Sequence, residues 1–286
     1  MIEQAVFSGL LTGSLFGLIA IGLTLIWGIM KIVNFAHGEY LMVGLYVAYF
    51  LITARAMDPY ATLLITPVVL FALGALTYRL VIRHVLQAPA MNQILLTVGL
   101  SLVLQNLALA IASANVLFAP SRYTTMVWRL GGLVLDVPRV VAALIALVTT
   151  AALYAFLHRT DTGLSIRAIA QDHEAARLMG IDVHRTNMLA FGLGTGVLGV
   201  AASAMSTFYY ASPTVGLLFG LMAFIIVVLG GLGNVLGAFV GGLVIGVTES
   251  VGAALLPGSL ARVITFALFV LILLFRPQGL FGRVAE

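Results

Sequence analysis

The sequence predicts an all-α integral membrane protein: a polytopic bundle of eight or nine transmembrane helices, with broken or re-entrant segments among them. Three observations predict this fold class. Of the 286 residues, 62% are hydrophobic and only 8% are charged, whereas a soluble domain carries about 25% charged residues. Apolar runs near the roughly 20 residues that span a bilayer recur from end to end. Polar residues gather in the short connections between these runs, so residues 1–286 form a single membrane domain.

The apolar runs define the predicted spans in order. The first run follows Glu3 rather than Lys or Arg, is longer than a signal-peptide core and lacks a small-residue cleavage pattern, so it predicts the first membrane helix. The second and seventh runs are short, which suits broken or re-entrant pieces that are buried in protein or line a cavity. The predicted spans are residues 6–27, 40–53, 61–80, 94–112, 140–157, 187–208, 215–229, 236–255 and 260–275.

The distribution of positive charge predicts the orientation, because cytoplasmic connections carry an excess of Lys and Arg. If the polar stretch 158–186 is cytoplasmic, alternation of the spans places nine basic residues inside and five outside. The inner set is Lys31, Arg79, Arg83, Arg159, Arg167, Arg177, Arg185, Arg276 and Arg283, and the outer set is Arg55, Arg122, Arg129, Arg139 and Arg262. We therefore expect the N-terminus outside and the C-terminus in the cytoplasm. The net charge of +4 is explained by this bias and gives no support to nucleic-acid binding.

The longest external connection, residues 113–139, predicts a short hairpin. Residues 126–130 and 133–137 flank Gly131 and Gly132, as two short strands flank a tight turn. Contact with an extracytoplasmic partner and a plain surface hairpin both remain open for this segment.

Glycines occur at helical spacing in several spans. Glycines four residues apart form flat stripes on which helices pack closely, and the stripes are Gly9, Gly13 and Gly17; Gly192 and Gly196; Gly237 and Gly241; Gly242 and Gly246. The cluster Gly230, Gly231, Gly233 and Asn234 is different, because so many glycines break a helix and expose its backbone groups. It predicts a hinge or an element of the substrate pathway.

Three polar residues lie between the first two apolar runs. Asn34, His37 and Glu39 must find partners or line water, since burying such groups costs several kcal/mol otherwise. A helix that begins near Glu39 at membrane depth points its positive N-terminal dipole at an anionic substrate group. The alternative is a cytoplasmic turn with Glu39 as an ordinary first-turn acid. Glu249 lies within an apolar run and is a second pathway candidate, with an interhelical hydrogen bond as its alternative role.

The most polar long piece, residues 161–180, predicts a short surface helix. Leu164, Ala168 and Gln171 share one side of this helix, and Ile166 and Ile169 share another. The charged positions that stay in water are Asp172, Glu174 and Arg177. From the residues alone, an ordinary amphipathic connection at the membrane surface remains open.

Four segments carry a resemblance to a known family. Glu174-Ala175-Ala176 followed by Gly180 resembles the E-A-A-x3-G core of the loop by which permeases of ATP-binding cassette importers dock on their ATPases. The segments GLTLIWGIMKIVNFAHGE (22–39), VLGGLGNVLGA (228–238) and RPQGLFG (276–282) resemble blocks of the branched-chain amino acid permeases of the LivH type. The family's trailing hydrophobic-Leu-Pro element is missing, because no proline follows Gly180 until Pro213, which argues against the maltose or phosphate type.

The resemblance implies the function, partners and site residues. It implies half of the translocation pathway of a binding-protein-dependent importer in a bacterial inner membrane, for branched-chain amino acids or for another amino acid, urea or short amides. The implied partners are a second permease, two cytoplasmic ATPases and an external substrate-binding protein. The second permease is an identical copy or a LivM-like paralogue, and the resemblance favours the paralogue. Residues 158–186 become a coupling loop whose ATPase contacts are Arg167, Ala170, Asp172, Glu174, Ala175, Ala176, Arg177 and Gly180.

No set of residues predicts an enzyme. No nucleophile stands beside a base at a catalytic spacing, no Walker lysine follows a glycine loop, and no His-Glu pattern fits a zinc site. The chain has no cysteine. We therefore expect no cofactor or metal on this chain, with ATP and Mg²⁺ on partner ATPases. The competing class is a secondary transporter or channel that works without ATP, since glycine-interrupted helices also mark those proteins.

Overall fold

The computed structural model describes residues 1–130, 132–256, 260–276 and 278–282. Gly131, Pro277 and Arg283, which entered the predictions above, lie outside the described residues, as does the side chain of Arg262. The described chain forms eleven α-helices, two short 3-10 helices and one β-hairpin. Their bounds are α1 Ile2–Met30, α2 His37–Arg55, η1 Pro59–Leu64, α3 Thr66–Leu80, η2 Ile82–His84, α4 Ala90–Ala112, β1 Val127–Leu130, β2 Leu133–Asp136, α5 Val137–Arg159, α6 Asp161–Gln171, α7 His173–Leu178, α8 Val183–Met205, α9 Val215–Gly230, α10 Val235–Leu255 and α11 Leu260–Phe275.

All nine apolar runs form helices, which confirms the predicted fold class. In the described residues, six helical segments are long and apolar enough to cross a membrane, and α9 is a shorter apolar helix. The predicted hairpin is also confirmed, because β1 pairs antiparallel with β2 and Leu130 lies opposite Leu133.

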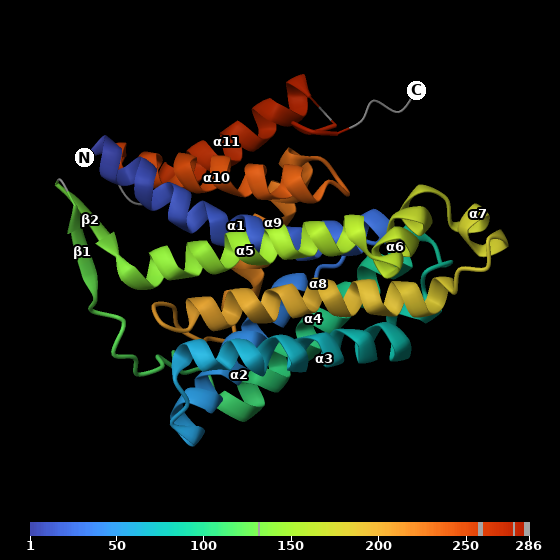
Figure 1. Ribbon diagram of the computed structural model, residues 1–286, viewed down its shortest axis with the longest axis horizontal. Helices are drawn as coiled ribbons and strands as arrows, with labels where there is room; N and C mark the ends of the chain where they lie inside the picture. Colours follow the sequence, from blue (N-terminus) through green and yellow to red (C-terminus); the bar gives the residue numbers. More distant parts are fainter. Residues whose placement is uncertain (131, 257–259, 277, 283–286) are drawn as a thin grey trace.

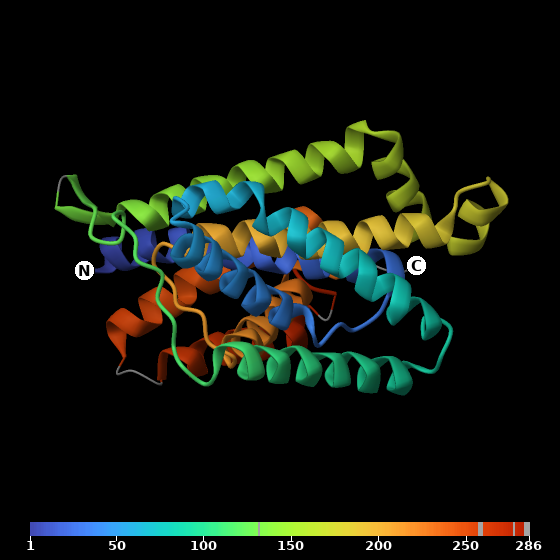
Figure 2. The same cartoon turned by 90° about the horizontal axis from the view of Figure 1, so that it is seen from below.

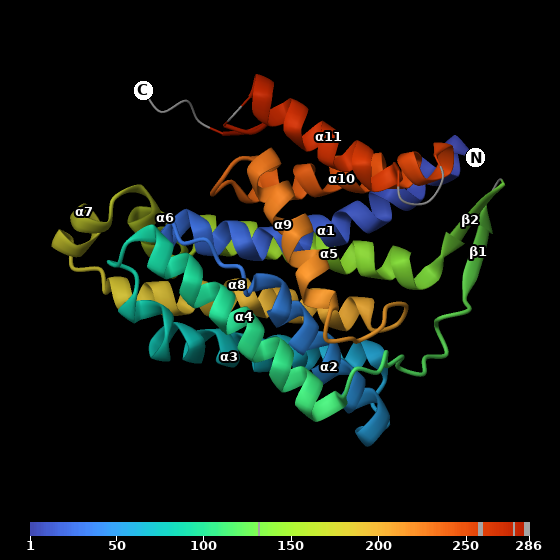
Figure 3. The ribbon, with the colours of Figure 1, turned by 180° about the vertical axis from the view of Figure 1, so that it is seen from behind.

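Most of the long helices lie roughly along one axis (Figure 1), with the N-terminus and the hairpin at one end of the bundle and α6 and α7 at the other. We call these the hairpin end and the α7 end. Turning the molecule shows α4 and α5 on opposite sides of the bundle, with α1 and α8 between them (Figure 2). Seen from behind, α9 crosses α1 steeply (Figure 3).

Polar caps begin several of these helices and fix where the chain turns. Thr160, Asp182 and Asn234 each accept a hydrogen bond from a backbone N–H in the first turn of α6, α8 and α10. Such a cap satisfies one of the backbone donors that a helix start leaves without a partner. Proline lies in the first turn of α3 and α5, where its missing N–H costs nothing.

Helix α1 lies at the centre of the bundle and meets α10 along a glycine seam. Gly9 and Gly13 face Gly242 and Gly246 so closely that a Cβ on Gly13 would lie 2.7 Å from the carbonyl oxygen of Gly242. Close backbone approach of this kind strengthens dispersion contacts between helices where lipid supplies no hydrophobic drive. The helix-packing interpretation of the four-residue spacing is therefore confirmed for these two helices.

Two helices begin inside the bundle rather than at its ends. The Nε2 atom of His37, the first residue of α2, lies 3.0 Å from the carbonyl oxygen of Ile19, which is about 16 Å before the end of α1 at 1.5 Å per residue. A segment without helical structure, residues 31–36, leads down to this point from the α7 end. Helix α9 follows a similar segment that descends from the hairpin end, where Leu117 bridges Ala211.

Candidate functional site

The predicted surface helix is split into two pieces at Asp172. Helix α6 ends at Gln171, and Asp172 has extended backbone before α7 begins. The prediction of one helix over this stretch was wrong, because the Asp172 side chain competes for the backbone as a cap. Of the two apolar sides predicted for α6, the side with Ile166 and Ile169 is buried, whereas Leu164 is exposed.

Capping explains the spacing of the E-A-A-x3-G pattern in α7. The Asp172 carboxylate accepts hydrogen bonds from the backbone N–H groups of Ala175 (3.0 Å) and Glu174 (2.8 Å), which lower its pKa below the ordinary value. At the other end the Gly180 N–H bonds to Arg177 O and the Ile181 N–H to Ala176 O. This is a Schellman cap, which needs the left-handed φ of +83° that Gly180 adopts.

Helix α7 is a rigid protrusion at the end of the bundle, as Figure 1 shows. Ala176 fixes it from below, being only 4% exposed, and the His173 ring nitrogen Nε2 lies 2.8 Å from Ile29 O at the end of α1. Its tip carries Leu178 and Met179, which are 88% and 83% exposed. Two adjacent exposed apolar side chains of this kind make the tip of α7 a candidate contact surface for a partner.

Leu178 and Met179 are absent from the residues that sequence reasoning selected. Their signal was present, because two adjacent apolar side chains interrupt a polar segment just before a capping glycine. The predicted docking residues Glu174, Arg177 and Gly180 lie beside them and are exposed.

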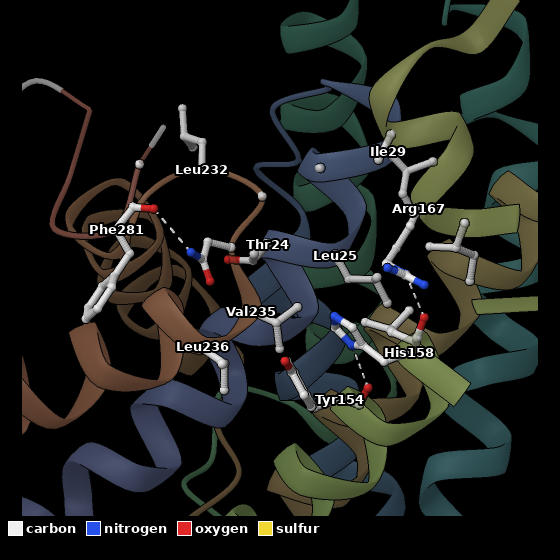
Figure 4. Close-up of a pocket in the computed structure, with 17 residues that line it drawn as sticks. Thr24, Leu25, Ile29, Tyr154, His158, Arg167, Leu232, Val235, Leu236 and Phe281 are labelled. Carbon is white, nitrogen blue, oxygen red and sulfur yellow. Dashed lines mark hydrogen bonds between the residues drawn. The ribbon is translucent and has the colours of Figure 1, made fainter. Parts of the chain in front are cut away.

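The predicted docking residues Arg167 and Ala170 lie apart from the tip of α7. They belong to α6 and line a cavity between α1, α5 and the turn that joins α9 to α10. The Arg167 Nε atom donates to Leu157 O at 2.9 Å, and Figure 4 shows its side chain beside His158 in this cavity. The structure thus leaves five of the predicted coupling residues exposed, buries Ala176 beneath α7, and places a half-buried pair on α6. The exposed five are Asp172, Glu174, Ala175, Arg177 and Gly180.

The three polar residues around the start of α2, one before it and two in its first turn, are buried. Asn34, His37 and Glu39 are each no more than 2% exposed. The Asn34 Oδ1 atom accepts from the Ala36 N–H at 3.1 Å, which turns the chain into α2. In the described part of the chain, Asn34 Nδ2, His37 Nδ1 and Glu39 Oε2 have no hydrogen-bond partner. Buried atoms of this kind mark a polar pathway or a site that needs a further group.

Glu39 lies where three helices meet. Ser101 of α4 donates to Glu39 Oε1 at 3.2 Å, and the other carboxylate oxygen lies against Gly216 in the first turn of α9. The positive end of the α9 dipole therefore faces this carboxylate. Sequence reasoning missed Ser101, because one serine in an apolar span carries no pattern that points to a partner 62 residues away.

The glycine cluster lies at the opposite end of α9 from Glu39. Gly231 and Gly233 have φ of +99° and +82°, so they make the tight turn between α9 and α10. Asn234 caps α10 and donates from Nδ2 to Phe281 O at 3.2 Å. Gly230, the last residue of α9, packs against Gly237 of α10. The structure therefore gives this cluster a turn role and separates it from Asn34, His37 and Glu39.

Glu249 lies at a third level of the bundle. It is partly exposed on α10, next to Ser250, whose Cβ lies 3.1 Å from the position of a Cβ added to Gly9 near the start of α1. The three predicted pathway groups thus occupy different levels rather than one pocket. Among the residues that the structure describes, no three His, Asp or Glu side chains gather as a metal site.

The bundle of apolar helices, its buried polar groups and its protruding α7 define the chain as a multi-pass membrane permease. Residues 5–273 match the family described as "Branched-chain amino acid transport system / permease component", and the chain belongs to this family. It is 32% identical over 294 residues to the high-affinity branched-chain amino acid transport system permease protein LivH of Escherichia coli K12, covering 98% of this chain and 95% of the relative.

Two further relatives extend this similarity. The permease protein BraD of Pseudomonas aeruginosa, from a high-affinity branched-chain amino acid transport system, is 32% identical over 293 residues, with 98% of this chain and 95% of the relative covered. A probable LivH of Methanocaldococcus jannaschii is 28% identical over 298 residues, covering 98% and 93%. No solved structure matches the chain significantly.

Proposed function

We propose that this chain forms one half of the translocation pathway of an ATP-driven importer for branched-chain amino acids, with α7 as its ATPase-docking element. The observation that carries the docking assignment is the capped helix α7 with its exposed apolar tip. The substrate class rests on the LivH and BraD relatives, whose names state it. The power for transport comes from separate ATPase chains, since no ATP-binding motif occurs in this sequence.

The remaining partners and the orientation follow from the same proposal. A second, related permease supplies the other half of the pathway, and an external binding protein delivers the substrate at the hairpin end. Docking on a cytoplasmic ATPase requires the α7 end to face the cytoplasm of a bacterial inner membrane. The basic side chains Lys31, Arg83 and Arg177, which line one crevice at that end, support this orientation through the positive-inside bias.

Two connections link α7 to the buried residues Asn34, His37 and Glu39, so a movement of α7 can displace them. His173 joins α7 to the end of α1 at Ile29. Lys31 follows immediately with a left-handed φ of 51°, and the segment after it carries Asn34 and His37 into the bundle. If α7 and the start of α2 have two arrangements, a partner shifts the equilibrium between them only by the difference in its affinity for the two. Closure of the ATPases would therefore move the start of α2 and expose Glu39 alternately to the two sides.

Replacing the tip of α7 tests the docking assignment. Leu178→Ser combined with Met179→Ser should release the ATPases from the purified complex and abolish vanadate-sensitive uptake, because the apolar contact is removed while both caps remain. Glu174→Ala and Gly180→Ala should have the same direction of effect. Leu164→Ser on α6 is the matched control, since Leu164 is also an exposed leucine of this segment. Unchanged co-purification and uptake in the α7 variants would refute the assignment.

Two alternatives predict different results in the same preparation. A secondary transporter or channel would move solute without any co-purifying ATPase and would respond to an ion gradient. A permease for urea, short amides or another amino acid would keep the ATPases but fail to transport leucine, isoleucine or valine. Competition of these solutes against labelled leucine in vesicles that contain the complete complex separates the substrate classes.

A further inference from the structure

A cavity of about 610 Å³ lies at the α7 end, outside the docking tip and the buried polar cluster. Figure 4 shows Thr24 and Leu25 of α1 in the middle of the view, with His158 of α5 and Arg167 of α6 on one side and Leu232 and Leu236 on the other. The cavity therefore lies between helices rather than at the outer tip of the molecule.

The charge of the cavity is positive and unbalanced. Arg167 and His158 line it, and among residues 1–130, 132–256, 260–276 and 278–282 no Asp or Glu does. Arg167 uses Nε to bond Leu157 O, and in the described part of the chain its guanidinium forms no ion pair. Its two terminal nitrogens are thus available to an anion, and a guanidinium binds phosphate oxygens in a forked geometry.

A second polar group points to a ligand independently. Thr24 on the cavity floor is 0% exposed, and its Oγ1 atom has no hydrogen-bond partner among the described residues. A buried hydroxyl without a partner is costly. A ligand acceptor would satisfy it once the side chains that cover Thr24 move aside to admit the ligand.

The walls of the cavity combine lipid-facing and headgroup-level residues. Leu144, Leu147 and Val148 on α5 are each more than half exposed, which predicts that this face of α5 contacts lipid. Tyr154 follows on the same helix at the rim of the cavity, where aromatic side chains mark the membrane–water interface. On the opposite wall Leu236 is about half exposed. This pattern predicts that the cavity opens toward lipid at headgroup level.

We propose that this cavity binds the phosphate headgroup of an anionic phospholipid, with Arg167 and His158 on the phosphate and the acyl chains along the exposed face of α5. A basic pocket between membrane helices is suited to such headgroups. Arg167 then stabilises the junction between α5 and α6 through lipid instead of contacting an ATPase. This proposal requires that the chain spans a membrane, but it does not depend on the transport mechanism proposed above.

Thermal unfolding of the delipidated full chain in detergent tests the proposal. Dioctanoyl phosphatidylglycerol should raise the melting temperature by about 2–4 °C over dioctanoyl phosphatidylcholine, since a ligand that binds the folded state stabilises it. Inorganic phosphate at the same concentration should give no shift, which distinguishes a lipid headgroup from a free anion. Native mass spectrometry of the unsubstituted chain should show preferential retention of phosphatidylglycerol.

Matched variants assign the effect to this cavity. Arg167→Gln should abolish the phosphatidylglycerol shift, Arg167→Lys should keep part of it, and Thr24→Val should reduce it. Arg159→Gln is the control, because Arg159 ends α5 as an exposed cation that does not line the cavity. Equal stabilisation by both lipids, a shift with phosphate alone, or an equal loss in Arg159→Gln would overturn the proposal. So would an Arg167→Gln chain that keeps the lipid shift but loses its ATPases.

Discussion

Helices α1 and α4 have the same mean hydropathy but opposite surroundings. Of the 18-residue window in α1, 78% is buried inside the protein, whereas in α4 the share is 11%. High hydropathy indicates that a segment is removed from water. It does not distinguish a lipid environment from a protein interior, because the two are equally apolar. Hydropathy therefore does not show which helix lies at the centre of the bundle. Glycine spacing does, because glycines four residues apart allow another helix to pack closely.

Glycines distinguish the two helices directly. Gly13 in α1 faces the backbone of α10 at close range, whereas Gly99 in α4 has nothing within 4 Å of an added Cβ. Helix α4 is held instead by a few polar contacts. Thr97 donates to Val33 O at 3.0 Å and Ser101 to Glu39 at 3.2 Å.

The largest expected effect is the difference between two variants, one with leucine in place of Gly13 and one with leucine in place of Gly99. Gly13→Leu should leave no folded protein, because the Cβ atom of the leucine already collides with α10. The remaining side-chain atoms raise the cost in stability above the roughly 1–3 kcal/mol of ordinary overpacking. Gly99→Leu should keep or slightly raise stability, since leucine favours a helix over glycine by about 0.5–1 kcal/mol. Fluorescence-detected size exclusion and thermal unfolding of both variants provide the measurement.

The same pair of variants shows whether the contrast survives assembly. If a second permease packs on α4, Gly99→Leu would fold normally alone but weaken the assembled complex. A folded, monodisperse Gly13→Leu chain would contradict the seam between α1 and α10.

Much of this fold could be predicted from the sequence, because hydropathy and glycine spacing are local signals. The nine helices and the hairpin fall within a few residues of their predicted bounds. The neighbours of each helix were less accessible. Nothing in the sequence placed the start of α2 beside Ile19 or the carboxylate of Glu39 against Gly216, since these contacts depend on tertiary packing.

The candidate site was predicted in part for the same reason. The polar character of α7 and its capping glycine are local, so Glu174 and Gly180 were found together. The family resemblance assigned Arg167 to the same docking loop, yet the break at Asp172 and the packing of Ile166 place Arg167 in a cavity between helices. Ser101 and the tip residues were missed, because their importance comes from a partner that is distant in sequence or from exposure.

The next effect concerns the polar contacts that hold α4. Ser101→Ala should destabilise the protein by about 1–3 kcal/mol, because it leaves a second buried oxygen of Glu39 without a donor. Thr97→Val should cost about 0.5–1.5 kcal/mol, the usual worth of one hydrogen bond. Thr149→Val is the control, since its hydroxyl bonds only to Ile145 O of its own helix at 2.7 Å. Thermal unfolding measures the stability of the three variants. If Thr149→Val lost as much stability as Ser101→Ala, the hydrogen bonds of Thr97 and Ser101 would have no special role in holding α4.

The smallest effect lies at the outer anchor of α4, where the chain after the helix returns to the start of η1. Asp58 accepts from Arg122 at 3.0 Å and from the Tyr123 hydroxyl at 2.8 Å. Partial burial raises the pKa of Asp58, but these bonds and that from the Tyr60 N–H outweigh it, so the pKa is lowered overall.

Because the pKa of Asp58 is lower in the folded state, the anchor stabilises the protein fully above the ordinary aspartate pKa of about 4. It is lost as the pH falls through the lowered value. Asp58→Asn keeps the helix cap but removes the charge, so it should lower the melting temperature by about 1–2 °C at pH 7. The difference between the two proteins should vanish in the most acidic range that they tolerate. A constant difference at all pH values would show that this anchor works through shape, as the seam of α1 does, and not through charge.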